Sequence, residues 1–344
     1  MVKFVGYPDI ENAQQQGFID KIKEQGYGNI PYVVFEKIHG GNSQVAYDIA
    51  SGEFTYGKRS GFLGEGENFY NLEEAVSPYK DSIVRVAKWL ISDLGEFGQC
   101  VESVVVFGEI CGGSYPHKDV VKDKHASRVQ KAVFYSPCNV WFAFDIAYRL
   151  RGIDRLFFLS GNKFIHYCAV AGIPMVPLVA VVNSLDIALS VPNDQESKVY
   201  KTFGLPKLEN NIMEGVVIRP AFVDVWIGYH RVIIKNKNTA FSEKKQAKKN
   251  EAPVEVPEAV KKACEEVLQY ITVNRVHNVI SHVGEVTEKD IGKLIMETSK
   301  DVLVDYRKEY DSLDKLEKKE EKMVTKFMNG EVAKVVRDVV LFGK

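Results

Sequence analysis

The chain has 344 residues, with 45 Lys and Arg against 46 Asp and Glu, so its formal net charge is −1. This length is typical of two domains, and the contents of 45% hydrophobic and 26% charged residues exclude a wholly disordered, collagen-like or coiled-coil chain. The near-neutral charge argues against a uniformly basic nucleic-acid binder, the apolar runs are too short to span a membrane, and the N-terminus lacks an apolar signal region.

The first two thirds of the chain alternate short apolar runs with Gly, Pro and Asn turns, which predicts strands. The predicted strands are Tyr32–Phe35, Gln44–Ile49, Val101–Ile110, Val140–Tyr148, Glu214–Arg219 and Arg231–Lys235. One helix is predicted over Ile83–Leu94, where apolar residues recur at helical spacing behind the capping pair Asp81-Ser82, and another over Asn162–Ala171. Residues 1–243 are therefore predicted to form an α+β domain with a mostly antiparallel sheet.

A linker is predicted at residues 244–257, because the chain becomes polar and rich in lysine there and reaches two prolines. Its lysines either contact phosphates or solvate the linker, and the second interpretation is favoured because charge runs are usually solvated. These lysines are Lys244, Lys245, Lys248 and Lys249. Residues 258–344 are predicted to form a helical domain. Its helices are expected around Val260–Ile271 and over Lys289–Glu297, Lys300–Asp311 and Leu313–Met328.

Six short segments contain the charged and aromatic residues that could carry chemistry, and all but Gly57–Gly61 lie at a predicted strand or strand end. They are Glu36–Asn42, Gly57–Gly61, Phe107–Ile110, Trp141–Ile146, Met213–Pro220 and Ile233–Asn238. In the first, Lys37 follows a strand and precedes His39 and two glycines, which suits a nucleophilic lysine beside a phosphate that approaches the backbone. Taken alone, this pattern is more often a glycine turn with an exposed lysine.

Glu214 and a pair of lysines extend the pattern. Glu214 begins an apolar strand, and Lys235 and Lys237 are two residues apart, so on a strand they share one face. Singly, a salt bridge at a sheet edge explains the glutamate, and extension of the side chains into solvent explains the lysines. The ordered combination of these residues with Lys37 is much rarer by chance.

Together the segments resemble the covalent nucleotidyltransferase superfamily of polynucleotide ligases and mRNA capping enzymes. The Lys-x-His-Gly motif at residues 37–40, Phe-Asp at 144–145 and Lys-x-Lys at 235–237 resemble the ATP-dependent RNA ligase 2 family. This family comprises phage-type double-stranded RNA ligases related to the kinetoplastid RNA-editing ligases. Residues 270–285 resemble its C-terminal domain. The resemblance implies an ATP-grasp-like adenylation domain with an antiparallel sheet, followed by a small all-α domain that binds an RNA nick.

The resemblance also implies a three-step joining of a 3′-hydroxyl to a 5′-phosphate. Lys37 would attack the α-phosphate of ATP and carry AMP as a covalent intermediate, AMP would pass to the RNA 5′-phosphate, and the 3′-hydroxyl would then displace it. A free lysine amine is almost entirely protonated at neutral pH. Lys235, Lys237 and a bound Mg²⁺ (or Mn²⁺) would disfavour that form and offset charge on the phosphate. Glu214 is the predicted metal ligand, directly or through a water.

The remaining roles follow from the resemblance. Glu109 would accept hydrogen bonds from the ribose, and Phe144 would stack on adenine. Core packing is the alternative for Phe144, and because Phe142 and Phe144 share a predicted strand face, one could be core and the other pocket. The predicted catalytic residues are Lys37, His39, Glu214, Lys235 and Lys237. The predicted nucleotide-binding residues are Glu36, Lys37, Asn42, Arg59, Glu109, Phe144, Glu214, Lys235 and Lys237. The predicted RNA-binding residues are Lys58, Arg59, Asp145, Arg275, Asp301 and Asp305.

Two of these assignments have equally good structural alternatives. A hairpin arginine in solvent would explain Arg59, and an Arg–Asp bridge within the helical domain would explain Arg275, Asp301 and Asp305. One position departs from the family, since Phe35 stands where a basic residue is often found.

The alternative functions are a DNA ligase or an mRNA guanylyltransferase of the same superfamily, or a non-catalytic RNA-binding module. The first two usually carry a β-barrel after the Lys-x-Lys segment, where this sequence is predicted to be helical. A binding module would have no reason to keep Lys37, Glu109 and Glu214 together. We therefore expect a monomeric ligase that seals nicks in duplex RNA, without a membrane partner. We expect it in the cytoplasm, including the host cytoplasm if a virus encodes it.

Overall fold

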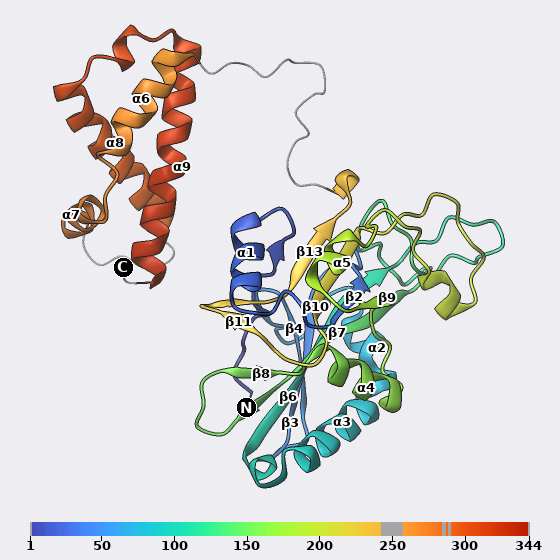
Figure 1. The fold of residues 1–344 in the computed structure, drawn as a ribbon. Coiled ribbons are helices and arrows are strands. Elements are labelled where there is room, and N and C mark those ends of the chain that lie inside the picture. The colour runs from blue at the N-terminus through green and yellow to red at the C-terminus, as the bar shows by residue number, and fades with distance from the viewer. Residues whose placement is uncertain (1, 242–256, 284–286, 288–289, 343–344) are drawn as a thin grey trace. The chain divides into compact units, whose positions relative to one another are not determined.

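A computed structural model describes residues 2–241, 257–283, 287 and 290–342. The chain divides into two compact units, Met1–Lys245 and Gln246–Lys344 (Figure 1). The predicted linker at residues 244–257, with its four lysines, lies outside the described residues except for Pro257. Among the described residues, no helix is both long and apolar enough to cross a membrane.

The first unit contains a six-stranded antiparallel sheet in the order β5-β4-β3-β6-β7-β8. Its strands are β3 (Gly41–Asp48), β4 (Phe54–Lys58), β5 (Gly61–Phe62), β6 (Val101–Gly112), β7 (Asn139–Leu150) and β8 (Leu156–Phe158). The long strands β6 and β7 are rich in Val, Ile and aromatic residues, which suit a pleated surface that is buried. They bury nearly every side chain over their central residues.

A five-stranded sheet runs in the order β1-β13-β10-β2-β9 and is antiparallel apart from the β1–β13 pair. Its strands are β1 (Glu11–Asn12), β2 (Tyr32–Glu36), β9 (Leu178–Val182), β10 (Gly215–Pro220) and β13 (Ile234–Lys237). A separate hairpin pairs β11 (Trp226–Ile227) with β12 (His230–Arg231). Strand β2 pairs with both β9 and β10, so it is an inner strand, and all its residues are buried.

The described residues of the first unit form five α-helices. They are α1 (Gln16–Glu24), α2 (Leu72–Val76), α3 (Lys80–Asp93), α4 (Gly161–Ala171) and α5 (Leu185–Ser190). Helices α3 and α4 contribute side chains to one core cluster shared with β2, β6 and β7. The predicted cap of α3 is wrong, because the helix continues directly from a 3-10 turn at Ser77–Tyr79 and Asp81 lies in its first turn. Ser160 caps α4, where its hydroxyl accepts from the backbone of Lys163.

The regular secondary structure of the second unit, in its described residues, is helical, as predicted. Its helices are α6 (Glu258–Leu268), α7 (Val273–Val283), α8 (Ile291–Glu309) and α9 (Lys318–Phe342). They pack around one apolar core that includes Val260, Val276, Leu294 and Val332. The predicted bounds of α8 and α9 are wrong. Helix α8 runs through both predicted helices because no Gly or Pro interrupts it near Ser299, and α9 begins later and ends later than expected.

The predicted α+β class is confirmed, and five of the six predicted strands each overlap a single observed strand. The sixth, Arg231–Lys235, is divided between β12 and β13. The backbone turns between them, since the N–H of Ile233 donates to the carbonyl of Arg231 at 2.7 Å. This turn allows Arg231 and Lys235 to belong to different sheets.

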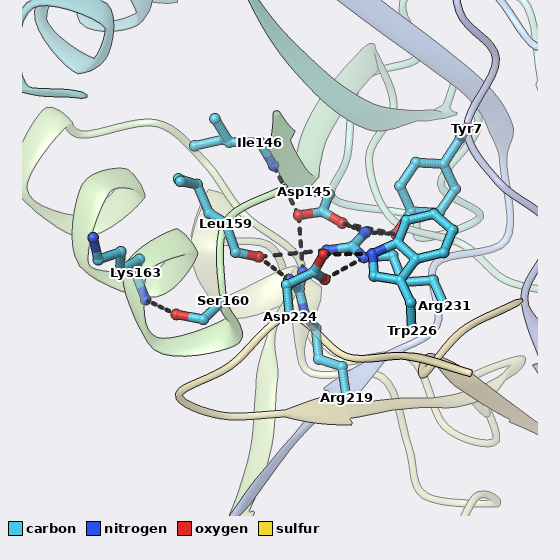
Figure 2. Close-up of polar contacts among 10 residues, drawn as sticks. All are labelled: Tyr7, Asp145, Ile146, Leu159, Ser160, Lys163, Arg219, Asp224, Trp226 and Arg231. Atoms are coloured by element: carbon cyan, nitrogen blue, oxygen red, sulfur yellow. Dashed lines mark hydrogen bonds and ion pairs between the residues drawn. The ribbon is translucent and has the colours of Figure 1, made fainter. Parts of the chain in front are cut away.

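Asp145 on β7 lies at the centre of a buried ion network (Figure 2). Its Oδ1 is 2.9 Å from Nη1 of Arg219 on β10, and its other oxygen contacts Arg231 on β12. The hydroxyl of Tyr7 donates to that second oxygen at 2.8 Å. Burial opposes ionisation, but the two guanidinium groups outweigh it and hold the pKa of Asp145 below its usual range. The network joins the two sheets.

The position of Asp145 corrects our prediction that it contacts RNA. Its side chain is 0% exposed, and its partners occupy both carboxylate oxygens. A nucleic acid would have to displace an arginine to reach it. Its place beside Phe144 in the Phe-Asp motif therefore has a structural explanation.

We predict that Asp145→Asn destabilises the first unit by roughly 3–5 kcal/mol, the usual loss when one partner of a buried ion pair is removed. Asparagine keeps the shape but leaves Arg219 without a counter-charge and Arg231 with only Asp224 as its partner. Because the folded pKa is lowered, the stabilisation is present above the unfolded carboxyl pKa of about 4 and is lost as the pH falls through the folded value. Urea unfolding at several pH values measures it.

Asp154→Asn is the matched control. Asp154 also contacts an arginine, Arg149, but its side chain is 73% exposed, so solvent screens the pair. Equal destabilisation by the two variants would contradict the role of the buried network.

Candidate active site

A cavity of about 290 Å³ is lined by residues of both sheets of the first unit. Every predicted nucleotide-binding residue except Glu214 lines it, and Glu214 touches two that do. Those lining it are Glu36, Lys37, Asn42, Arg59, Glu109, Phe144, Lys235 and Lys237. The sequence analysis missed Tyr7, Asp9 and Arg219, which also line it. Tyr7 lies in an N-terminal segment without any recognisable pattern, whereas Arg219 is part of a segment that we had singled out.

Strand pairing brings the predicted nucleophile to the predicted carboxylate. Lys37 directly follows β2, Glu214 directly precedes β10, and these strands are antiparallel neighbours. The N–H of Lys37 donates to the carbonyl of Gly215 at 2.9 Å, which continues the ladder past the end of β2. Nζ of Lys37 therefore reaches Oε2 of Glu214 at 2.7 Å.

The next strand supplies the second lysine. β13 pairs with β10 so that Lys237 stands opposite Gly215, and Nζ of Lys237 lies 3.1 Å from Oε1 of Glu214. Lys235, two residues earlier, lines the cavity as well, as the predicted shared face requires. One carboxylate thus holds a lysine on each of its oxygens.

His39 is the third partner of Glu214. Its Nδ1 lies 3.3 Å from Oε2, and its ring meets the edge of Phe241 at 5.2 Å between centroids. Glu214 is only 3% exposed, and burial alone would raise its pKa. The hydrogen bond from His39 and the charges of Lys37 and Lys237 outweigh burial and lower the pKa of Glu214 to about 2. Glu214 is therefore ionised at neutral pH.

The glycine turn after Lys37 has a packing reason. A Cβ atom on Gly40 would collide with the carbonyl oxygen of Ile110 on β6. The N–H of Gly40 instead donates to Oε1 of Glu109 at 3.1 Å. We had associated this glycine with the close approach of a phosphate. The structure shows that Gly40 is needed because β6 leaves no room for a side chain there.

Two other carboxyl groups in the cavity titrate near neutrality. Burial raises the pKa of Glu109 to about 7, although Lys37 opposes the shift. Burial also raises the pKa of Glu36 to about 7, and hydrogen bonds from Ser197 and Lys198 oppose it. Oε1 of Glu36 is buried without a hydrogen-bond partner among the described residues. Each group can therefore accept or donate a hydrogen bond near pH 7, which suits hydroxyl and amino groups of a ligand.

A β-bulge turns Phe144 toward the cavity. Phe107 stands opposite Asp145 and Gly108 opposite Ala143, so Phe144 is an extra residue between them. Its ring packs edge-on against Tyr7 at 4.9 Å and lines the cavity. Phe142, in contrast, is 2% exposed and belongs to the core. One phenylalanine is thus in the core and the other lines the cavity, as the sequence suggested. The two positions are separated by a β-bulge and not by simple alternation along the strand.

Two predicted RNA-binding residues lie on the surface near β4. Arg59 lines the cavity, is 61% exposed and pairs with Asp9. Lys58 pairs with Glu67. Exposed ion pairs of this kind are weak, so both side chains remain available to a ligand, and their RNA contacts stay predictions.

The predicted RNA-binding residues of the second unit contact one another. Arg275 on α7 pairs with Asp301 and, at 2.9 Å, with Asp305, both on α8. Its side chain is 16% exposed. This is the internal bridge that the sequence allowed as an alternative. Any RNA contact by Arg275 would have to compete with two carboxylates.

Metal binding was predicted only for Glu214. Among the described residues, no cluster of three or more His, Cys, Asp or Glu side chains has a geometry that could hold a metal ion. Glu214 is ionised, as a ligand of a hard cation must be, but Lys37, His39 and Lys237 surround it. A metal ion bound to Glu214 would take most of its other ligands from oxygen atoms of a bound substrate.

Two family models match the sequence. A model described as RNA ligase matches residues 30–237, and one described as T4 RNA ligase 2 C-terminal matches residues 254–334. Both matches agree with the division into two units.

Individual relatives give similar matches. The mitochondrial RNA-editing ligase 1 of Trypanosoma brucei brucei is 27% identical over 353 residues, covering 86% of this chain and 74% of that protein. RNA-editing ligase 2 of the same organism is 27% identical over 158 residues, covering 42% of this chain and 37% of that protein. A solved structure of a Naegleria gruberi RNA ligase variant with ATP and Mn has 15% identity and a TM-score of 0.46. It covers 70% of this chain, which spans 58% of that one.

We predict that Glu36→Gln stabilises the protein at pH 8 but not at pH 5. Because burial raises the pKa of Glu36 from 4.5 to about 7, its neutral form is favoured in the fold. The stabilisation is complete below the unfolded pKa and is lost as the pH rises through 7. Neutral glutamine avoids that loss, which is at most roughly 3 kcal/mol at about 1.4 kcal/mol per pKa unit.

Denaturant unfolding at the two pH values measures the difference. Glu53→Gln, at an exposed position, is the control. An equal effect of Glu36→Gln at both pH values would show that the buried carboxyl does not ionise in this range.

Proposed function

The chain belongs to the RNA ligase family, and we propose that it joins RNA ends in an ATP-dependent reaction through a lysyl-AMP on Lys37. The observation that carries this proposal is the buried Glu214 carboxylate, which holds Lys37 and Lys237 at 2.7 and 3.1 Å beside a cavity. The lysine is thus fixed at a strand end, and a second cation lies next to it. Such an arrangement suits an amine that attacks a phosphate.

The cavity suits a nucleotide whose α-phosphate lies at Lys37. Adenine would stack on Phe144, and the ribose hydroxyls would donate to Glu109. Oε1 of Glu36, which has no hydrogen-bond partner among the described residues, would accept a hydrogen bond from the nucleotide. This bond would remove the free-energy cost of a buried acceptor without a donor. Arg59 would exchange its weak pair with Asp9 for a phosphate or ribose oxygen.

In the first step, Lys37 leaves its ion pair with Glu214 and gives up a proton to solvent water. The lone pair of Nζ then attacks the α-phosphorus, a P–N bond forms, and the bond to the bridging oxygen breaks. Pyrophosphate departs with that electron pair. Lys235 and Lys237 stabilise the negative charge that develops on the phosphate oxygens, and Glu214 keeps Lys237 in place for this purpose.

A divalent cation, Mg²⁺ or Mn²⁺, fits the donor set only in part. Glu214 offers an ionised carboxylate, and the described residues provide no cage of three or more ligands. Glu214 would therefore hold the ion together with nucleotide phosphates and water. Such an ion would supply additional neutralisation of phosphate charge.

AMP then passes from Lys37 to the RNA 5′-phosphate, and the 3′-hydroxyl displaces it to form the phosphodiester. We propose that His39, Asn42 and Arg59 help to place the RNA ends. The helical second unit would hold a nicked duplex, which proteins recognise by shape and 2′-hydroxyls. Its match to a ligase C-terminal family supports this division.

One chain contains all the residues of the proposed site, so we propose a monomer. We propose that it acts in the cytoplasm, in a cell or in a host infected by a virus that encodes it. The matched editing ligases are named as mitochondrial, so fractionation of source cells tests this assignment.

The experiment that tests the function is incubation with labelled ATP and Mg²⁺, followed by a denaturing gel and peptide mapping. We predict that wild type acquires label on Lys37 and that Lys37→Ala acquires none, because Lys37 is the amine that Glu214 holds at the end of β2. Lys21→Ala, which changes an exposed lysine on α1, should label normally. Undiminished labelling of Lys37→Ala would place the nucleophile elsewhere.

We predict that Glu214→Gln and Lys237→Ala each slow formation of lysyl-AMP by roughly 10²–10³-fold, the usual cost of removing one preorganised charged group. Both variants should remain folded, since Lys237 lines the cavity and glutamine keeps the shape of the buried Glu214 side chain. Single-turnover rates of labelling measure the effect. Glu67→Gln, which breaks the exposed pair with Lys58, is the control. Wild-type rates in both site variants would refute the proposed charge arrangement.

We predict that a fragment of residues 1–249 forms lysyl-AMP but does not seal a nicked RNA duplex. The first unit has its own core and contains every residue assigned to ATP chemistry. The missing helical unit would hold the duplex, so the fragment should also bind nicked RNA more weakly in a gel-shift assay. Efficient sealing by the fragment would reduce the second unit to a stabilising element.

A further inference from the structure

The connection between β6 and β7 contains an exposed basic segment, residues 117–131, that none of the motifs includes. It contains five basic residues against the acidic Asp119 and Asp123, an excess of positive charge in a chain whose net charge is −1. The basic residues are Lys118, Lys122, Lys124, Arg128 and Lys131. All five side chains are exposed. In Figure 1 the connection runs as a long teal-to-green loop outside the sheets.

The lysines of this segment have no internal partner among the residues that the structure describes. Some other surface lysines of the first unit pair with carboxylates, as Lys3 does with Asp154 at 2.8 Å and Lys207 with Glu196 at 2.6 Å. Within the described part of the chain, no such hydrogen bond or ion pair forms at the four lysines of the segment. Arg128 differs, since it lies over the ring of Phe134 at 4.7 Å. The positive charge of the lysines is therefore not neutralised within the described chain.

The backbone of the segment is fixed to the ends of both long strands. The N–H of Val129 donates to the carbonyl of Gly112 at 3.2 Å. The side chain of Asn139 bonds both backbone groups of Ser127, at 2.8 and 3.2 Å. Gly113 has a φ of +81° and no room for a Cβ beside Ser127. These contacts give the lysines a defined position on the surface.

The segment also adjoins the turn that follows Lys37. Nε2 of Gln130 donates to the carbonyl of Gly40 at 3.4 Å. Just beyond the segment, the hydroxyl of Tyr135 accepts from the N–H of His39 at 2.8 Å. Lys131 therefore follows a residue that touches the active-site turn. A polyanion that crosses the segment would continue toward the nucleophile.

We infer that residues 117–131 form a binding surface for the phosphodiester backbone of the RNA duplex at the active site. The inference rests on the proposed function and adds a contact surface to it. Flexible lysines contact phosphates as point charges and read no sequence, which suits an enzyme that joins ends in varied duplexes. Counter-ions released from RNA by these contacts favour binding and make it dependent on salt.

The test compares two triple variants with equal changes of charge. The first is Lys122→Gln, Lys124→Gln and Lys131→Gln in the segment. The matched control is Lys21→Gln, Lys88→Gln and Lys163→Gln, at exposed helical positions of the first unit. A third variant replaces the segment lysines by arginine and so keeps the charge. Binding of nicked RNA duplex is measured against salt concentration in the full chain, with lysyl-AMP formation as the readout of an intact fold.

We expect the segment variant to bind nicked RNA roughly ten-fold more weakly, with a salt slope smaller by about one for each phosphate that its side chains no longer neutralise. Its KM for nicked RNA should rise, while lysyl-AMP formation stays at the wild-type rate. The control and arginine variants should bind like wild type. The inference is overturned if the segment variant matches the control in affinity and salt slope. If wild type forms no lysyl-AMP or binds no RNA, the proposed function fails and this inference fails with it.

Discussion

A carboxylate buried between two sheets must be surrounded by cations, and this constraint shapes the first unit at two places. Asp145 meets the guanidinium groups of Arg219 and Arg231, which stay charged at any working pH and fit a carboxylate in fixed geometry. Glu214 meets lysines and a histidine. These partners can release protons and move on flexible stems. The same need for counter-charge therefore produces a rigid connection at Asp145 and an adjustable one at Glu214.

The two places are also linked through the cavity wall. Tyr7 bonds to Asp145 and packs against Phe144, the proposed support for adenine. Arg219 comes from β10, the strand that Glu214 precedes. A rigid ion network behind the aromatic ring thus fixes the distance between the base platform and the lysines. Positioning of this kind is what an in-line attack on phosphorus requires, because small misplacements of the reacting groups lower the rate strongly.

The sequence predicted the centre of the site because each of its residues stands at the end of an apolar strand. Lys37, Glu214 and Lys237 meet because β2, β10 and β13 are neighbours in the sheet. Local sequence patterns do not predict which strands pair. Asp145 was assigned to RNA from the resemblance. A polar residue on a strand can face solvent or an internal arginine, and only the fold decides between them. Tyr7 was missed for the same reason, since its partners lie far away in the chain.

The three carboxyl groups around Lys37 illustrate how burial and charge share one cavity. A triphosphate would be repelled by Glu36, Glu109 and Glu214 if all were ionised. Burial keeps the pKa of the first two near 7, so part of their population is neutral at physiological pH. Glu214 remains ionised because a hydrogen bond from His39 and the charges of Lys37 and Lys237 adjoin it. The cavity can therefore present two adjustable hydrogen-bonding groups to a nucleoside and keep one permanent negative charge where it orders the lysines. Glu214 differs from the other two carboxyl groups because two strand ends place lysines against it. These are Lys37 at the end of β2 and Lys237 at the end of β13.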